Sequence, residues 1–170
     1  INDVSGGLAD PDMAVTVASL DTDYICMHWR AHSDRMDAAD VYEDVVAEVR
    51  DELATRVEAL TAAGVKPERI ILDPGLGFAK VGESNWPLLA NIPAWAGDKR
   101  VLIGASRKRF LGAAIGRPDG DPTEREAATT AVTALVAAQG VWAVRVHDVS
   151  ASCDAIAIAN AWKSATHGPG

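Results

Sequence analysis

The chain has 170 residues and a formal net charge of −8. This length suits one domain with a sizeable core, and the hydrophobic content of 48% is ordinary for a globular protein. The negative charge argues against nucleic acid and anionic membranes as partners, and no apolar run is long enough to span a bilayer. The two cysteines, Cys26 and Cys153, have no paired spacing, which indicates reduced thiols and a cytoplasmic location.

Five short apolar runs predict β-strands. In chain order they cover residues 1–4, 24–29, 69–73, 100–104 and 141–147. Nearly continuous runs rich in β-branched residues are typical of parallel strands that are buried on both faces.

Helical patterns separate these strands. They cover residues 13–20, 41–63, 84–89, 127–139 and 150–163. Thr123 and Glu126 have the spacing of a capping box ahead of the fourth helix, and Gly140 follows its end.

The alternation of strand and helix predicts a parallel sheet with right-handed crossovers. Two architectures fit this order, an open doubly wound sheet and part of a (β/α)8 barrel, whose complete form needs roughly 250 residues. Doubly wound sheets gather ligands at one switch point, whereas barrels carry polar residues at the ends of many strands. Polar residues follow all five predicted strands, namely Asn2-Asp3, His28, Asp73, Ser106-Arg107-Lys108 and Arg145-x-His147-Asp148. We therefore predict an α/β fold, a partial (β/α)8 barrel, with residues 1–170 as a single domain.

These strand-end residues have both structural and functional interpretations. Asp73 precedes Pro-Gly, so it either nucleates a turn or faces a heterocycle that presents two adjacent N–H donors. Lys108 is either a solvated lysine or a cation in the barrel mouth. Arg145 and His147 would share one face of a strand, which is typical of an oxyanion or phosphate site. His28 alone is interpreted as a hydrogen-bonded core histidine rather than a ligand.

Five motifs in this order resemble the dihydropteroate synthase family, and its mycobacterium-like members in particular. They are INDVSGG, the MH after the second strand, LDPGLGFAK, GASRKRF and RVHDV. The resemblance implies a (β/α)8 barrel that joins 6-hydroxymethyl-7,8-dihydropterin pyrophosphate to p-aminobenzoate, with sulfonamides as inhibitors. It also implies that this chain corresponds to strands four to eight of the barrel, so that the first three strands lie outside it.

The resemblance also implies roles for single residues. Pterin-binding residues would be Asn2, Val4, Met27, Asp73, Gly104 and Lys108. Residues that contact p-aminobenzoate would be Phe78, Ser106 and Arg109, and Arg145 and His147 would hold the leaving pyrophosphate. Lys108, Arg145 and His147 would then be the catalytic residues, and we expect Asp73, Lys108 and His147 to surround one hollow. Arg107 is expected to be structural and to pack on the helix that follows it.

By the same resemblance, pyrophosphate departs first, assisted by Mg²⁺, and the aniline nitrogen then attacks the pterin cation. The expected Mg²⁺ ligand would lie outside this chain, which is itself expected to be poorly stable or inactive alone. Family members commonly form homodimers through helices near the C-terminal end, for which residues 124–139 are a plausible contact.

Three alternatives stay open from the residues. They are a non-catalytic pterin-binding paralogue, a pterin-dependent methyltransferase barrel, and a metal-dependent hydrolase that uses His28, Asp73 and His147. A pair that holds pyrophosphate argues against the first two, and the third would usually require a His-x-His motif on the first strand of the barrel.

Overall fold

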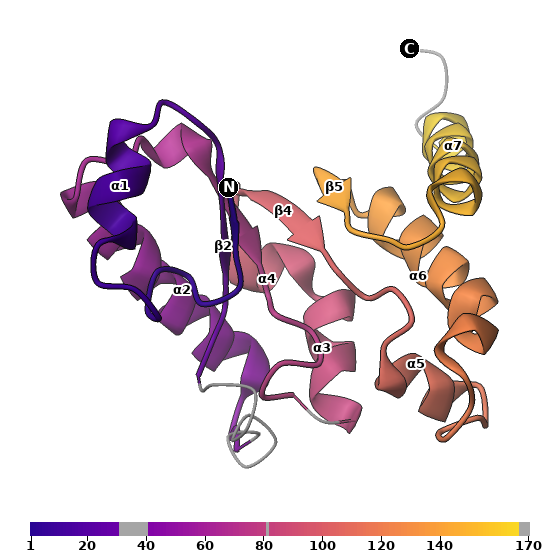
Figure 1. Ribbon diagram of the computed structural model, residues 1–170. Coiled ribbons are helices and arrows are strands. Elements are labelled where there is room, and N and C mark those ends of the chain that lie inside the picture. The colour runs from indigo at the N-terminus through magenta and orange to yellow at the C-terminus, as the bar shows by residue number, and fades with distance from the viewer. Residues whose placement is uncertain (31–40, 81, 167–170) are drawn as a thin grey trace. The chain divides into compact units, whose positions relative to one another are not determined.

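The computed structural model describes residues 1–30, 41–80 and 82–166 (Figure 1). The chain forms two compact units, Ile1–Leu102 (unit 1) and Ile103–Gly170 (unit 2), and each is described by itself. The prediction of a single domain over residues 1–170 stays a prediction.

Five strands in the described residues form one sheet. They are β1 (Asn2–Asp3), β2 (Tyr24–Met27), β3 (Ile70–Asp73), β4 (Arg100–Ile103) and β5 (Ala143–Val144). Their order in the sheet is the order of the sequence, and β1 to β4 pair in parallel. Because this order has no reversal, the sheet lacks the switch point of the doubly wound alternative. The predicted α/β fold with five parallel strands is confirmed.

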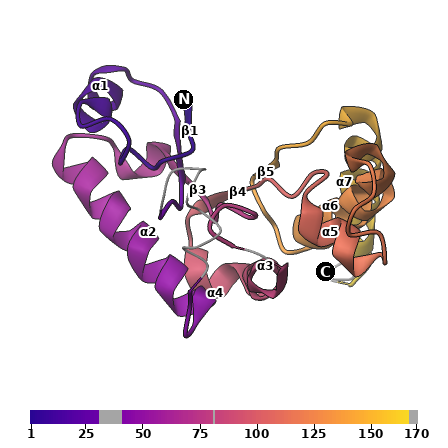
Figure 2. The ribbon, with the colours of Figure 1, turned by 60° about the horizontal axis from the view of Figure 1, so that its bottom comes forward.

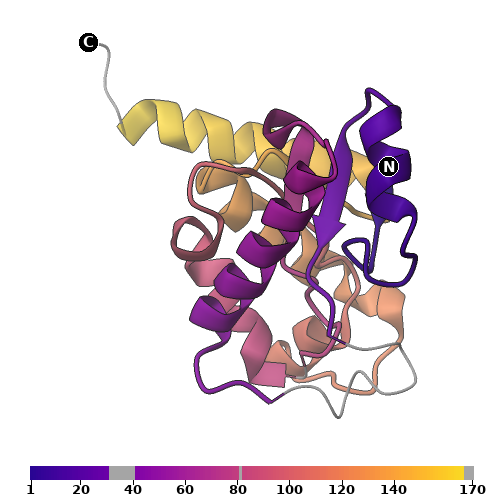
Figure 3. The ribbon, with the colours of Figure 1, turned by 90° about the vertical axis from the view of Figure 1, so that its left-hand side faces the viewer.

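Unit 1 buries β2 and β3 beneath the long helix α2 (Val45–Ala62), which lies alongside β2 (Figure 3). Ile70, Ile71 and Leu53 are each at most 1% exposed. Burial of side chains on both faces of the central strands explains why their sequences read as continuous apolar runs.

Helix α2 begins later than predicted. The Asp44 carboxylate accepts hydrogen bonds from the amides of Val46 and Ala47, both at 3.0 Å, and so caps the helix. The predicted start at residue 41 is wrong, and Val41 is 74% exposed.

The other helices in the described residues of unit 1 are short. They are α1 (Met13–Ser19), η2 (Pro67–Arg69), η3 (Gly82–Ser84), α3 (Asn85–Ala90) and α4 (Ile92–Ala96). The helices predicted over residues 13–20 and 84–89 are confirmed as α1 and α3. Helix α4 escaped prediction because five residues are too few to show a helical period. It is fixed by the buried Trp95, whose indole N–H donates to the Leu88 carbonyl at 2.9 Å.

Unit 2 contains α5 (Arg109–Ala114), η4 (Pro122–Arg125), α6 (Glu126–Ala138) and α7 (Val149–Thr166), and Figure 2 shows α5, α6 and α7 grouped together. The helices predicted over residues 127–139 and 150–163 are confirmed. Strand β5 is shorter than the predicted run of residues 141–147, so that Arg145 and His147 follow the strand instead of lying on it.

The predicted capping box is wrong. The Asp121 carboxylate accepts hydrogen bonds from the Thr123 amide (2.8 Å) and hydroxyl (2.6 Å), and thereby caps η4. Since Asp121 and Pro122 start this turn upstream, Thr123 lies inside it, and α6 begins at Glu126 without a side-chain cap.

The longest helices, α2 and α7, lack the apolar length needed to cross a membrane, as does every other helix in the described part of the chain.

Candidate functional site

The loop after β1 is organised by Asp3. Its carboxylate accepts hydrogen bonds from the amide and hydroxyl of Ser5 (both 2.9 Å), the amide of Gly7 (2.7 Å) and the hydroxyl of Tyr24 (2.6 Å). Burial by itself would raise the pKa of Asp3, but these hydrogen bonds outweigh it and lower the pKa below its ordinary value. The predicted pterin residues Asn2 and Val4 flank Asp3 and are exposed, so a rigid carboxylate-centred loop presents both of them.

Met27 and Asp73 are brought together at the ends of neighbouring strands. They are register partners in the β2–β3 pair, and they are 0% and 1% exposed. Oδ1 of Asp73 accepts a hydrogen bond from the Gly75 amide at 2.8 Å, so the turn-forming interpretation of Asp73 is confirmed. Its binding of a heterocycle stays a prediction.

The loop of residues 74–80 is held by two buried polar side chains. Nζ of Lys80, which is 2% exposed, donates to the carbonyls of Phe78 (3.1 Å) and Gly75 (3.4 Å). Asn85, which is 0% exposed, accepts from the Gly77 amide at 2.8 Å and donates to the Lys80 carbonyl at 3.2 Å. The conformation of the backbone around the half-buried Phe78 is therefore determined by side-chain contacts.

Lys80 also joins a buried chain of hydrogen bonds through His28. Nζ of Lys80 lies 2.8 Å from Nδ1 of His28, and Nε2 of His28 lies 2.9 Å from Oε2 of Glu52. Because a carboxylate only accepts, the ring proton is on Nε2, and Nδ1 accepts from Lys80. The interpretation of His28 as a hydrogen-bonded core histidine is confirmed. The sequence did not single out Lys80. Its segment LDPGLGFAK has closely spaced glycines but lacks the Lys-Thr or Lys-Ser ending of a phosphate-binding P-loop.

Two pKa shifts follow from this chain. Burial lowers the pKa of His28 to about 4, although Glu52 opposes the shift. Burial alone would raise the pKa of Glu52, but hydrogen bonds from His28 and Arg30 lower it to about 2. His28 is therefore neutral, and Glu52 ionised, near neutral pH.

Unit 2 brings together four predicted site residues at the carboxyl ends of β4 and β5. The Arg145 amide donates to the Ile103 carbonyl at 2.9 Å, and the guanidinium of Arg145 lies against Gly104. A Cβ added at Gly104 would stand 2.5 Å from a terminal nitrogen of Arg145, so this position requires glycine if Arg145 is to stay in place.

Ser106 holds His147 in the same cluster. The Ser106 hydroxyl lies 2.8 Å from Nδ1 of His147 and accepts from the His147 amide at 3.2 Å. His147 is exposed and Arg145 is half-buried, so both groups are positioned by buried neighbours while His147 remains accessible to a ligand.

The backbone changes direction at Arg107, between Ser106 and Lys108. Arg107 has a left-handed φ of +59°, which side-chain-bearing residues rarely adopt. Its Nε forms an ion pair with Oε2 of Glu126 at 2.6 Å. The structural interpretation of Arg107 is confirmed, but its ion pair is with the start of α6, not with α5, which follows it. Lys108 is half-buried at the start of α5, and Arg109 is exposed.

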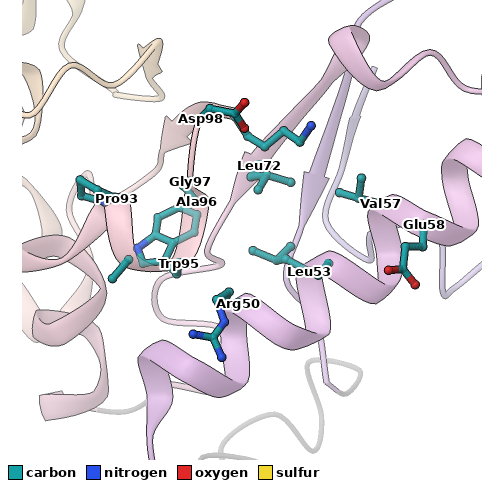
Figure 4. Close-up of a pocket in the computed structure, with 13 residues that line it drawn as sticks. Arg50, Leu53, Val57, Glu58, Leu72, Pro93, Trp95, Ala96, Gly97 and Asp98 are labelled. Atoms are coloured by element: carbon teal, nitrogen blue, oxygen red, sulfur yellow. The ribbon is translucent and has the colours of Figure 1, made fainter.

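Two cavities lie in unit 1, and no residue that the resemblance assigns to a substrate lines either of them. One of about 370 Å³ has an apolar floor that includes Leu53, Leu72 and Trp95, with charged groups such as Arg50 and Asp98 around it (Figure 4). Since successive side chains of a strand point to opposite faces, Leu72 faces this cavity and Asp73 faces away from it. The second, of about 260 Å³, lies beside His28 and Glu52.

Across residues 1–30, 41–80 and 82–166, no group of three or more His, Cys, Asp or Glu side chains could hold a metal ion. The site residues that are brought together are Met27 with Asp73 in unit 1, and Gly104, Ser106, Arg145 and His147 in unit 2. Because Asp73 belongs to unit 1 while Lys108 and His147 belong to unit 2, a single hollow around these three stays a prediction.

Comparisons with known proteins agree on one family. The family model described as pterin binding enzyme matches residues 1–147. Dihydropteroate synthase of Mycobacterium leprae is 50% identical over 167 residues, which cover 95% of this chain and 59% of that protein. Dihydropteroate synthase of Synechocystis is 38% identical over 168 residues, which cover 96% and 56%. The chain thus spans less than two thirds of the length of these relatives.

Solved structures give the same result. Dihydropteroate synthase from Xanthomonas albilineans in complex with 7,8-dihydropteroate matches with a TM-score of 0.86 and 37% identity, over 99% of this chain and 60% of that one. The same enzyme with 4-aminobenzoic acid matches equally well, at 38% identity over 99% and 58%. The Yersinia pestis enzyme in a sulfonamide drug complex matches with a TM-score of 0.89 and 28% identity, over 96% and 58%.

Proposed function

Because the chain belongs to the pterin-binding enzyme family, we propose that its protein is a dihydropteroate synthase, a transferase of folate biosynthesis. The reaction joins 6-hydroxymethyl-7,8-dihydropterin pyrophosphate to p-aminobenzoate and releases pyrophosphate. The names of its relatives and the ligands of the matching solved structures support this proposal.

The observation that carries the proposal is the cluster in unit 2. Arg145 lies against Gly104, and His147 is bonded to Ser106, so two groups able to bind an anion are preorganised side by side at the ends of β4 and β5. Hydrogen bonds and cations fixed before the reaction stabilise charge that develops on a leaving group. A module that only binds pterin has no need of such a pair.

We assign the pterin to the buried Asp73 and Met27, with Asn2, Val4, Gly104 and Lys108 as further contacts. The carboxylate of Asp73 can accept two parallel hydrogen bonds from an amidine-like ring edge, the strongest geometry open to a carboxylate. The buried methionine beside it supplies an apolar surface for the ring.

We assign p-aminobenzoate to Phe78, Ser106 and Arg109. The half-buried ring of Phe78 and the exposed guanidinium of Arg109 suit an aromatic ring that carries a carboxylate. Since the Ser106 hydroxyl already bonds to His147, Ser106 would also tie the aminobenzoate side of the site to the pyrophosphate side.

In the proposed reaction, Arg145 and His147 bind the pyrophosphate oxygens as the C–O bond to the pterin breaks. Lys108 donates to the pterin and orients it for attack by the aniline nitrogen. No group of three or more His, Cys, Asp or Glu side chains lies together in the described residues, so no step is assigned to a metal.

The test is turnover of the two substrates by the protein at the length that its gene encodes, followed by release of pyrophosphate. His147→Gln is expected to lower kcat by about 100-fold, as removal of one charge-stabilising donor does elsewhere. Arg117→Gln, at an exposed position of the same unit, is the matched control. Tight pterin binding without turnover would instead support the non-catalytic paralogue, and methyl transfer would support the methyltransferase. The 170-residue chain, assayed in parallel, tests the expectation that it is inactive alone.

We also propose a homodimer in the cytoplasm, formed through α6 and α7. Leu135 on α6 is 65% exposed, and Ile158 and Trp162 on α7 are 70% and 73% exposed, which is unusual for large apolar side chains of neighbouring helices. The cytoplasmic part of this proposal is supported by both cysteines being free. Ile158→Glu is expected to yield a monomer in sedimentation velocity experiments, and an unchanged dimer would contradict the assignment.

A further inference from the structure

The left-handed backbone at Arg107 is stabilised from α6. The Arg107 amide donates to Oγ1 of Thr129 at 3.0 Å, and the Arg107 carbonyl accepts from Nη1 of Arg125, also at 3.0 Å. Both backbone groups of the residue with positive φ are therefore bound by side chains that lie four positions apart and thus on one face of the α6 region. Arg107 itself does not account for the positive φ, because an arginine favours negative φ.

Arg125 is built into this position. It is 5% exposed, and its Nη2 donates to the Gly120 carbonyl at 2.7 Å. A Cβ added at Gly112 would stand 2.8 Å from Nε of Arg125, so a glycine of α5 leaves the space that the side chain occupies. A planar guanidinium can bind two carbonyls in fixed directions, which the single ammonium of lysine does not reproduce.

Thr129 completes the arrangement. Its hydroxyl donates to the Arg125 carbonyl at 3.0 Å, which directs a lone pair of Oγ1 towards the Arg107 amide. The ion pair of Arg107 with Glu126 fixes the side chain that leaves the turn.

We propose that Arg125 is a positioning residue: it holds the left-handed conformation of Arg107 and thereby sets the directions of Ser106 and Lys108. Ser106 directly precedes Arg107 and bonds to His147, while Lys108 directly follows Arg107 at the start of α5. The proposal deepens the synthase function and rests on it for the substrate contacts of Lys108 and His147. It adds to the site a buried residue that lies 18 positions after Arg107 in the sequence.

The Arg107→Gly substitution separates positioning from simple packing. Glycine adopts a φ near +59° without steric cost, so the turn no longer needs Arg125 to hold it. A positioning role therefore predicts that loss of Arg125 is costly with Arg107 present and nearly harmless in the Arg107→Gly background. A packing role of Arg125 predicts the same cost in both backgrounds.

The experiment compares kcat and KM for pyrophosphate release by the protein at its gene-encoded length. Arg125→Met is expected to lower kcat about 30-fold in the wild-type background and at most about three-fold in the Arg107→Gly background, within the range of losses seen when charge-stabilising groups are misplaced. Arg125→Lys undergoes the same comparison and is the milder variant should Arg125→Met not fold. Arg117→Met is the control for loss of an exposed arginine nearby. Equal costs in the two backgrounds would overturn the proposal.

A second readout does not depend on turnover. The ring ¹⁵N shifts of His147 report its bond to Ser106, and they are assigned by their loss in His147→Gln. Arg125→Met is expected to move these shifts with Arg107 present and to leave them unmoved in the Arg107→Gly background. Shifts that do not respond to Arg125→Met would refute the positioning role. A wild-type protein without synthase activity would refute the proposed function. The His147 shifts would still test the positioning role of Arg125.

Discussion

A buried cation stabilises both the loop of residues 74–80 and the turn of residues 105–108, but it comes from a different part of the chain in each case. Each follows a buried strand, and in each a buried cation binds backbone carbonyls, Lys80 in the first and Arg125 in the second. Lys80 belongs to the loop that it holds, whereas Arg125 comes from 18 residues further along the chain. The first loop can therefore form largely from local contacts, while the second requires α6 to be in place.

The glycines next to the two regions also differ in their surroundings: Gly75 lies in the loop, and Gly104 directly precedes the turn. A Cβ at Gly75 would stand 2.4 Å from the backbone oxygen of His28, and Gly75 has a φ of +65°. The three atoms nearest to a Cβ at Gly104 would all belong to the flexible end of Arg145, the first at 2.5 Å. The backbone cannot move aside as a guanidinium can, so the same substitution should have different consequences.

The largest expected effect is therefore that of Gly75→Ala. It should lower the free energy of unfolding by about 3 kcal/mol or more, because backbone strain and a backbone clash add. Gly104→Ala should change stability by less than about 1 kcal/mol but displace Arg145 and lower turnover about ten-fold. Urea unfolding and the synthase assay measure the two effects.

Gly116→Ala is the control for strain alone, since Gly116 has a φ of +73° and no atom within 4 Å of an added Cβ. It should cost about 1 kcal/mol. Equal losses of stability for Gly75→Ala and Gly104→Ala would contradict the distinction between a rigid and a yielding neighbour.

Lys80→Met tests the local half of the comparison. It leaves Nδ1 of His28 without the donor at 2.8 Å in a buried site, and it removes the donor to the Phe78 carbonyl. A loss of about 3 kcal/mol is expected in urea unfolding, since unsatisfied buried groups are costly. Lys66→Met is the matched control, because Lys66 is a 59% exposed partner of Asp21 and should contribute less than about 1 kcal/mol. A loss of stability no greater than that of the control would mean that the loop keeps its conformation without Lys80.

The buried hydrogen bonds of His28 should also make the free energy of unfolding depend on pH. Since the folded pKa of His28 is about 4, below the ordinary value of 6.5, the unfolded state takes up its proton first as the pH falls through 6.5. Stability should be complete above pH 6.5 and decline towards pH 4, by about 2 kcal/mol between about pH 7 and pH 5. Glu52, whose pKa is lowered to about 2 from 4.5, should cause a further loss below pH 4.5.

Urea midpoints at about pH 7 and pH 5 measure this dependence. His28→Gln, which cannot take up the proton, should show a smaller decline than the wild type over that range. A wild-type midpoint that does not change would show that His28 is not buried in its neutral form.

Thr129→Val is expected to have the smallest effect. It tests whether α6 supports the turn of residues 105–108. It removes the acceptor of the Arg107 amide with little change of shape, and should cost about 1 kcal/mol. Thr129→Ser should restore most of the loss. Thr130→Val is the matched control, because the Thr130 hydroxyl donates only within its own helix, to the Glu126 carbonyl. Equal effects of the two valine variants in urea unfolding would remove Thr129 from the support of the turn.

Much of the fold could be predicted because its signals are local. The apolar runs at β2, β3 and β4 and the long stripe of α2 each lie within one stretch of sequence. Two helix starts were predicted wrongly, and each error has a physical reason. The start of α2 was missed because the cap is Asp44, after the stripe begins, and the cap of α6 because Asp121 displaces the expected one at Thr123.

The candidate site could be predicted only in part. Asp73, Arg145 and His147 could be named as candidates because they follow apolar strands, and their roles stay predictions. Lys80 and Arg125 could not be predicted. Lys80 closes a glycine-rich loop that lacks the sequence of a phosphate-binding loop. Arg125 is one of several charged residues before a helix. Nothing near them in the sequence indicates that both are buried.

The sequence by itself determined the order of strands and helices and the polar residues at the strand ends, because burial of a strand and periodicity of a helix depend on neighbouring residues. Only the tertiary structure decided which groups hold those ends in place. His28 and Lys80 are 52 residues apart, Ser106 and His147 are 41, and Arg107 and Arg125 are 18. Such pairs form because folding buries at least one group of each pair, and a buried polar group is costly unless the fold brings it a hydrogen-bond partner.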